Sequence, residues 1–367
     1  ELVCMGFKLY RKDKTVPLYE ALPMLENLGL KVISEEAYEL CLSNGEIVWI
    51  NDLHLEFKNF AHGNFNEVRT IFQDAFYSVW LNNSENDEFN ALVLAANLTW
   101  REVVLLRSYA RYFKQIETAF SQQYIADTLL RNAPIVSKLL DLFMLRFNPD
   151  VDDIQTANDK MSELSSGIIT DLDEVKVLDE DRILRKYLHL INATIRTNYF
   201  QESSDGGHKQ YVSFKIDPSK IPGFPLPVPC SEIFVYSPRF EGVHIRFDHV
   251  ARGGLRWSNR REDYRTEVLG LSKAQQVKNS IIVPAGAKGG FITKHISIST
   301  DREVMMEEGV ACYQLFINGL LDLVDNYENN RIVRCGRIRA YDEDDPYLVV
   351  AADKGTATFS DYANAVS

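Results

Sequence analysis

The spacing of apolar residues changes twice along this chain of 367 residues, and that change constrains the fold more than any other feature. Up to about residue 58 the apolar residues alternate as in strands, around one helical segment. Until about residue 200 they then recur at helical spacing, and beyond that short apolar runs alternate with helical segments and with glycine and proline. The sequence therefore predicts a multidomain α/β and α protein, with an α+β module over 1–58, a helical region over 59–202 and an α/β domain over 203–367.

The first region reads as strand, helix, strand, strand. Alternating apolar residues from Val3 to Leu9 predict the first strand, and leucines on one face between Pro17 and Gly29 predict the helix. Apolar runs at 30–42 and 46–57 flank an Asn-Gly dipeptide, which is a strong hairpin signal. The pattern predicts a ferredoxin-like or ACT-like module, a kind that often regulates or packs.

The second region carries helical patterns. An apolar stripe from Val68 to Trp80 has helical spacing, and further helical patterns cover 100–120, 122–147 and 181–199, with an acidic loop or short helix within 148–180. The aromatic residues fall on the stripes, which favours core packing over a cofactor site. A turn-rich stretch at 203–207 indicates the boundary of the next region.

The third region opens with five prolines between Pro218 and Pro229, which exclude a regular helix there. The pattern after them predicts strands at 232–237, 242–248 and 280–284 and helices at 262–279 and 302–326.

Charge and composition narrow the possible partners. The net charge of −12 disfavours nucleic acid, but the window 239–294 holds 11 Lys/Arg and 5 Asp/Glu, a local charge of +6. Such a window indicates an anionic ligand, an acidic neighbour or a solvated basic face. Five scattered cysteines without a Cys-x-x-Cys pair argue against a disulfide framework and a structural zinc site, so we expect no metal.

The sequence also bears on location. No stretch reaches the roughly 18 apolar residues that a membrane span needs. The N-terminus has neither the basic start nor the apolar run of a signal peptide. We expect a cytoplasmic chain without a membrane partner and, since it begins within a strand pattern, a fragment.

Three clusters in the last third could carry chemistry. In the first cluster, Gly253 and Gly254 let the backbone approach a ligand closely, and Arg252 and Arg256 could each bind a carboxylate through two nitrogens. A tight turn with surface arginines would explain the same residues. In the third, Asp353 follows an apolar run and precedes a glycine, a position where α/β sheets carry ligands; it could equally cap a helix.

The second cluster has glycines on both sides of Lys288, after a strand-like run. A lysine enclosed by protein can lose its proton near neutral pH and act as a base. Gln275 and Lys278 lie three residues apart and would share one face of a helix. The spacing of a phosphate-binding P-loop is absent.

Several long motifs in one order resemble the glutamate dehydrogenases, and specifically their large NAD-specific bacterial form, over roughly 230–367. They are Gly-Val-His-Ile-Arg-Phe at 242–247, Ala-Arg-Gly-Gly-Leu-Arg-Trp-Ser at 251–258, Arg-Glu-Asp-Tyr-Arg-Thr-Glu-Val-Leu-Gly-Leu at 261–271, Lys-Ala-Gln-Gln-Val-Lys-Asn at 273–279, Val-Pro-Ala-Gly-Ala-Lys-Gly-Gly-Phe at 283–291 and Asp-Pro-Tyr-Leu-Val-Val-Ala-Ala-Asp-Lys-Gly-Thr at 345–356.

The resemblance implies two catalytic residues. Lys288 matches the base that activates water on the iminoglutarate intermediate, and Asp353 matches the aspartate that relays protons to and from the substrate nitrogen. The implied reaction converts L-glutamate to 2-oxoglutarate.

The resemblance also implies substrate-binding residues. Gln275 and Lys278 match the pair that holds the α-carboxylate, allowing a one-residue shortening before Pro284. Arg252 stands where the smaller hexameric relatives have a lysine for the side-chain carboxylate, so Arg256 or another arginine could share that role. Gly253 and Gly254 match the adjacent glycine pair.

NAD is the implied cofactor. No two glycines in this chain lie two positions apart, so the Gly-x-Gly-x-x-Gly fingerprint cannot be present, and the family carries its dinucleotide domain after the segment with the aspartate. We therefore expect a domain absent from this chain to bind NAD, the chain alone to be inactive as a dehydrogenase, and the full-length protein to be a homo-oligomer.

Two other functions remain open from the sequence. In one, the chain is a regulatory or oligomerisation module whose ACT-like part binds an effector. In the other, the loop Gly286–Gly290 binds a phosphate or nucleotide. That function would need a helix directly after the loop and a metal-binding Ser/Thr, and Phe291 in that position counts against it.

Overall fold

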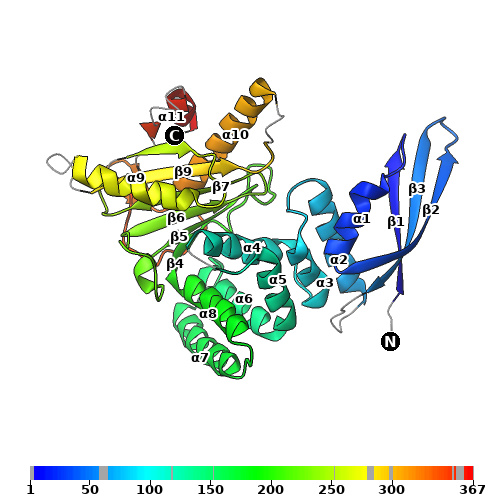
Figure 1. The fold of residues 1–367 in the computed structure, drawn as a ribbon, viewed down its shortest axis with the longest axis horizontal. Helices are drawn as coiled ribbons and strands as arrows, with labels where there is room; N and C mark the ends of the chain where they lie inside the picture. Colours follow the sequence, from blue (N-terminus) through cyan, green and yellow to red (C-terminus); the bar gives the residue numbers. More distant parts are fainter. Residues whose placement is uncertain are drawn as a thin grey trace. The chain divides into compact units, whose positions relative to one another are not determined.

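The computed structural model describes residues 4–57, 65–116, 119–151, 153–251, 253–278, 285–296, 301–348, 351–352 and 359–366. Contacts between residues divide the chain into two compact units, one formed by Glu1–Arg107 with Ser121–Ser137 and the other by Ser108–Phe120 with Lys138–Ser367 (Figure 1). The three domain ranges predicted from the sequence stay a prediction.

The N-terminal unit begins with the predicted strand-helix-strand-strand module. Its sheet is antiparallel with strand order β1-β3-β2. The elements are β1 (Cys4–Lys12), α1 (Leu18–Asn27), β2 (Leu30–Cys41), β3 (Ile47–Phe57) and α2 (Phe65–Trp80). The hairpin prediction is confirmed: Gly45 has φ +83°, which favours glycine, in the turn between β2 and β3. Phe7 of β1 packs its ring 4.9 Å from that of Phe72 of α2, so the apolar stripe of α2 covers the sheet.

Short helices complete this unit: η1 (Glu88–Ala91), α3 (Leu92–Ala95), the first half of α4 (Trp100–Gln115) and α5 (Gln122–Arg131). Arg107 of α4 is fully buried and pairs with Asp87 at 2.7 Å. The same carboxylate caps η1 by accepting a hydrogen bond from the Phe89 backbone. One ion pair therefore fixes the loop before η1 to α4.

The second unit is built on a seven-stranded mixed sheet with strand order β12-β8-β9-β7-β6-β5-β4 (Figure 1). Its strands are β4 (Thr194–Thr197), β5 (Val212–Ile216), β6 (Ser231–Tyr236), β7 (Phe240–Arg246), β8 (Gly254–Trp257), β9 (Ala287–Thr293) and β12 (Ala351–Ala352). Neighbours from β4 to β9 are antiparallel, whereas β9–β8 and β8–β12 are parallel.

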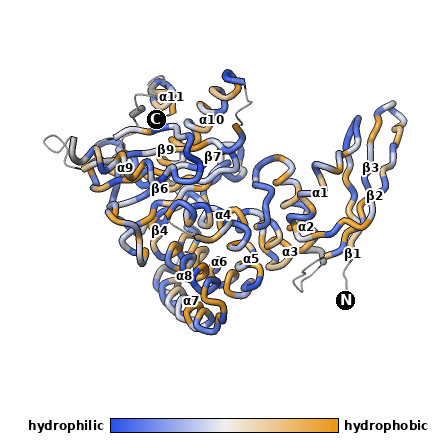
Figure 2. The backbone as a smooth tube through the Cα atoms, in the orientation of Figure 1, coloured by the Kyte–Doolittle hydropathy of each residue, from blue (hydrophilic) through white to orange (hydrophobic). Residues whose placement is uncertain are grey.

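Further helices and one hairpin accompany this sheet. They are α6 (Ala133–Phe147), α7 (Ile154–Asp173), α8 (Leu178–Ala193), α9 (Tyr264–Lys278), α10 (Arg302–Leu321) and α11 (Ser360–Val366), with a short η2 (Pro218–Lys220) and a hairpin of β10 (Asn326–Glu328) and β11 (Arg331–Val333). Hydrophobic stretches alternate with hydrophilic ones along α7 and α8, as expected of helices with one buried face (Figure 2).

Glycines in the sheet show which helix covers which face, because an added side chain would collide with the covering helix. A methyl group at Gly242 would lie 2.5 Å from the Phe316 ring of α10, and one at Gly290 would lie 2.5 Å from the Val268 side chain of α9. Residues 242 and 290 lie on opposite faces of β7 and β9, because residue 242 pairs with residue 291. Helices α10 and α9 therefore pack on opposite faces of the sheet.

Several predicted elements were wrong in detail. Thr194–Thr197 is strand β4, not helix, because its β-branched residues pair with β5. The segment 122–147 is two helices, interrupted at Asn132, with Pro134 in the first turn of the second. The segment 148–180 contains a helix of 20 residues, α7, and α10 ends at Leu321. The predicted strand 280–284 lies outside the described residues.

Candidate functional site

Lys288 lies in β9, near the middle of the sheet. It pairs with Ile245 of β7 on one side, and the next residue, Gly289, pairs with Leu255 of β8 on the other. The side chain is 3% exposed. Residues 287–290 form a regular strand. The phosphate-loop hypothesis is therefore wrong for these residues, because it required a loop leading directly into a helix.

The glycines around Lys288 permit close packing. A methyl group at Gly253 would lie 1.4 Å from the Ala287 carbonyl oxygen, closer than any real side chain can approach. One at Gly289 would lie 2.2 Å from the Leu255 side chain. Glycine is therefore required where the start of β8 passes β9, and the first cluster contains a strand, Gly254–Trp257, where a tight turn was the alternative.

Helix α9 covers the face of the sheet to which Lys288 belongs. Lys288 and Gly290 share that face because side chains alternate along a strand, and Gly290 lies under Val268 of α9. Gln275 is partly buried on the same helix, and Lys278 is its last residue. Lys288 and the α9 segment carrying the predicted carboxylate-binding pair thus belong to one sheet–helix layer. The Lys278 side chain, like all of Arg252 and Asp353, lies outside what the structure describes.

The strands next to Arg252 and Asp353 in the sequence, β8 and β12, lie side by side. Gly254 pairs with Ala351, and Leu255 pairs with Ala352, in parallel. Residue 353 follows β12 directly in the sequence, and residue 252 precedes β8 by two positions. The backbone thus places β8 between the strand that carries Lys288 and the strand that precedes Asp353. The roles of Arg252 and Asp353 stay predictions.

A buried ion pair anchors α9 to the sheet. Arg265 of α9 donates from Nε to Glu232 Oε2 of β6 at 2.9 Å, and Tyr112 of α4 donates to the same oxygen at 2.8 Å. Burial alone would lower the pKa of Arg265, but the charge and hydrogen bonds of Glu232 outweigh it and raise that pKa. The pair stays ionised and fixes the start of the helix that carries Gln275 and Lys278.

Comparison with known proteins identifies the family. The profile described as "Bacterial NAD-glutamate dehydrogenase, catalytic domain" matches residues 167–367, more than half of the chain. The chain belongs to the bacterial NAD-glutamate dehydrogenase family. Two further profiles match residues 84–149 ("Glutamate dehydrogenase, helical motif 3") and residues 4–68 ("Glutamate dehydrogenase, ACT3 domain"). The predicted order of an ACT module, a helical region and a substrate-binding type of domain is confirmed.

Curated relatives of this family are similar along nearly the whole chain. The NAD-specific glutamate dehydrogenases of Halomonas elongata and Pseudomonas aeruginosa are each 51% identical, over 99% and 98% of this chain. That of Mycobacterium tuberculosis is 44% identical over 96%. The chain spans 22% of the length of each of these relatives.

In this family member, acids outside the basic window 239–294 offset part of its positive charge. Among the described residues of the window, six cations form ion pairs: Arg239, Arg246, Arg256, Arg260, Arg265 and Lys294. Three of the partners, Glu232, Glu308 and Asp345, lie outside the window. Acidic neighbours outside the window therefore account for part of the local positive charge.

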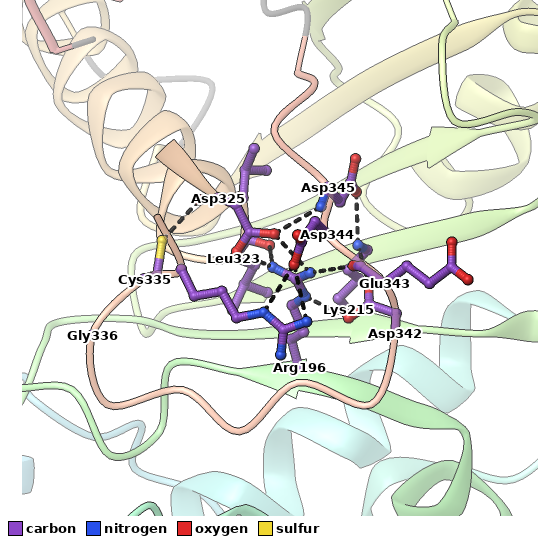
Figure 3. Close-up of polar contacts among 12 residues, drawn as sticks. Arg196, Lys215, Leu323, Asp325, Cys335, Gly336, Asp342, Glu343, Asp344 and Asp345 are labelled. Atoms are coloured by element: carbon purple, nitrogen blue, oxygen red, sulfur yellow. Dashed lines mark hydrogen bonds and ion pairs between the residues drawn. The ribbon is translucent and has the colours of Figure 1, made fainter. Parts of the chain in front are cut away.

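A second buried network lies on the opposite face of the sheet and was not predicted from the sequence. Three strands each place a cation there, and the segment after α10 supplies the acids; Figure 3 shows two of the cations, Arg196 and Lys215, with the acids. The cations are Arg196 of β4, Lys215 of β5 and Arg246 of β7, and the acids are Asp325, Asp342 and Asp345. A charged residue inside an otherwise apolar strand indicates a buried ion pair, but the sequence does not reveal which acid is the partner.

The described residues hold neither a metal-ligand cluster nor a membrane-spanning helix. None of their His, Cys, Asp and Glu side chains gather in groups of three or more that could hold a metal ion. No helix in the same part of the chain is long and apolar enough to cross a membrane.

Proposed function

We propose that this chain forms the substrate-binding part of an NAD-specific glutamate dehydrogenase, which converts L-glutamate, NAD+ and water to 2-oxoglutarate, NH4+, NADH and a proton. The observation that carries the proposal is the position of Lys288, buried in a central strand, between glycines, under the helix that bears Gln275 and Lys278. Lys288 would act as the base toward water at the substrate α-carbon, and Asp353 would exchange protons with the substrate nitrogen.

Different residues would bind the two carboxylates of the substrate. Gln275 and Lys278 would hold the α-carboxylate, and Arg252 would hold the side-chain carboxylate, with Gly253 and Gly254 letting the backbone come close. The chain offers no dinucleotide fingerprint, and its sheet is largely antiparallel, so NAD would be bound outside this chain. NAD, when bound, would accept a hydride from the substrate α-carbon.

Two wider expectations belong to the same proposal. A cytoplasmic location is supported by the five free cysteines, which suit a reducing compartment. Assembly of the full-length protein into a homo-oligomer is an expectation that follows from the family.

In the full-length enzyme, Lys278→Ala should raise the KM for L-glutamate by about 100-fold, because it removes a charge-assisted hydrogen bond worth roughly 2–3 kcal/mol. The measurement is the initial rate of glutamate-dependent NADH formation. Lys273→Ala is the matched control, because Lys273 is an exposed lysine of the same helix and should change KM less than threefold. Equal effects of the two variants on KM would show that Lys278 of α9 does not bind the substrate.

A second candidate function, effector binding by the ACT module, has its own supporting observation. A pocket of about 440 Å³ between β1 and α2 is lined by apolar and aromatic side chains, including Phe7, Leu9 and Trp80, together with Arg11 and Asp74. Arg11 Nη1 is buried and has no hydrogen-bond partner among the described residues. An amino acid could place its carboxylate at Arg11, its ammonium at Asp74 and an apolar side chain among the aromatic rings.

L-leucine should therefore change the activity and the melting temperature of the full-length enzyme. Arg11→Met should raise the L-leucine concentration needed for the half-maximal effect at least tenfold. Lys12→Met is the matched control, because Lys12 lies on the exposed side of β1 and pairs with Glu46. No response to L-leucine, or an unchanged response after Arg11→Met, would exclude this pocket as an effector site for apolar amino acids.

A further inference from the structure

Arg246, the last residue of β7, links two segments that are far apart in the sequence. Its guanidinium donates from Nη1 to Asp345 Oδ1 at 3.1 Å and to the Tyr347 carbonyl oxygen at 2.7 Å, and from Nη2 to the second oxygen of Asp345. Both Arg246 and Asp345 are 5% exposed. One planar side chain thus holds a carboxylate and a backbone carbonyl two residues further along the chain.

Arg246 is also directly next to the candidate catalytic strand. It pairs with Ala287 of β9, the residue before Lys288, and the Phe247 backbone donates to the Gly286 carbonyl oxygen at 3.1 Å. Four residues after Tyr347 the chain enters β12, whose Ala351 pairs with Gly254 of β8. Arg246 therefore contacts Tyr347, which precedes β12 in the sequence, from the strand position that pairs with the neighbour of Lys288.

The other cations hold the rest of the same segment in place (Figure 3). Arg196 binds Asp325 through two nitrogens, at 2.8 and 3.0 Å, and donates to the Glu343 carbonyl oxygen at 2.8 Å. Lys215 binds Asp345 at 2.7 Å and also contacts Asp342. Residues 342–347 are thus fixed to β4, β5 and β7, and among the contacts of described residues Arg246 is the one of these three cations that reaches the backbone beyond Asp345.

The acid at the centre of the network stays ionised. Burial alone would raise the pKa of Asp345, but the hydrogen bonds and charges of Arg246 and Lys215 outweigh it and lower that pKa to about 2. Because its pKa in the folded state is below that of the unfolded chain, the stabilisation is complete above about pH 4 and is lost as the pH falls toward 2. The link between Arg246 and Asp345 therefore persists throughout the pH range in which a dehydrogenase is assayed.

We propose that Arg246 is a positioning residue for catalysis: by holding Asp345 and Tyr347, it fixes the described residues that precede β12 relative to the strand that carries Lys288. The inference rests on the proposed function, in which Asp353, the residue after β12 in the sequence, works on the same substrate as Lys288. Arg246 acts through these segments and does not itself touch substrate. A displacement of about 1 Å between reacting groups can cost roughly 100-fold in rate.

The test compares Arg246→Met and Arg246→Lys in the full-length enzyme, with kcat expressed per folded active site. Arg246→Met should lower kcat about 100-fold and change the KM for L-glutamate less than threefold. Arg246→Lys keeps the charge toward Asp345 and should recover part of the kcat. Arg334→Met is the matched control, because it removes the exposed pair with the neighbouring Asp344 and should leave kcat unchanged.

The possible results separate the inference from the proposed function. A normal kcat in either folded Arg246 variant, accompanied only by a lower melting temperature, would show a purely structural role and overturn the inference. If Arg246→Met fails to fold, Arg246→Lys still decides the question, because it must show a reduced kcat with a nearly unchanged KM. Normal activity of a Lys288→Ala enzyme would instead overturn the proposed function, whatever the result at Arg246.

Discussion

Arg265→Met should lower the free energy of unfolding by about 3–5 kcal/mol, because it leaves the carboxylate of Glu232 buried without its cation. Glu232 and Arg265 are 0% and 2% exposed, so water cannot replace the lost partner in the native fold. Tyr112 would still donate one hydrogen bond to Glu232 Oε2, which offsets only part of the cost. The measurement is urea unfolding of the chain followed by circular dichroism.

A matched variant controls for simple loss of an arginine. Arg260 pairs with Asp263 close to the start of the same helix, but both side chains are about half exposed, so Arg260→Met should cost less than about 1 kcal/mol. The double variant Glu232→Gln/Arg265→Met should be more stable than Arg265→Met alone, because no uncompensated charge remains. Equal costs for Arg265→Met and Arg260→Met would show that the buried pair does not hold α9 on the sheet.

Lys288→Ala should lower the kcat of the full-length enzyme for glutamate oxidation by about 1,000-fold, because general acid–base catalysis contributes roughly 100- to 10,000-fold to such reactions. The measurement is glutamate-dependent NADH formation at saturating substrate. Lys288→Arg keeps a positive charge but supplies no base at neutral pH, so it should be nearly as inactive. If charge alone mattered, Lys288→Arg would retain activity.

Chemical rescue distinguishes a catalytic from a structural role for Lys288. Lys288 is 3% exposed, so truncation to alanine leaves a cavity beside β7 and β9 that a small primary amine could enter. Added ethylamine should restore part of the lost kcat of Lys288→Ala and should not affect the unsubstituted enzyme. A variant that is stably folded, inactive and unaffected by amines would argue that Lys288 only supports the sheet.

The elements that could be predicted from the sequence are those fixed by local signals. The hairpin of β2 and β3 follows from Asn44-Gly45, and α1 follows from Pro17, its apolar face and Gly29. The strands β4 and β9 were not predicted, because Thr194–Thr197 follows a helix without a break and Ala287–Thr293 is rich in glycine. Pairing with neighbouring strands decides both segments, and it is invisible in a local window.

The candidate site was predictable as a set of residues but not as an electrostatic environment. Motif order identified Lys288, Gly253 and α9. The structure places Lys288 in β9, Gly253 directly before the adjacent strand β8, and α9 over the sheet. The partner of Arg246 lies 99 residues away in the sequence, and that of Arg265 lies 33 residues away. Such pairs depend on the strand order, so the sequence showed a basic window but not the outside acids that pair with three of its cations.

The position of a bound dicarboxylate relative to Lys288 tests the central claim most directly. The measurement is a crystal structure of the full-length enzyme with 2-oxoglutarate. We expect the Lys288 Nζ within about 3–4 Å of the substrate carbonyl group, the distance needed for proton transfer directly or through one water. A 2-oxoglutarate molecule bound on the face covered by α10, or anywhere else away from Lys288, would contradict the account.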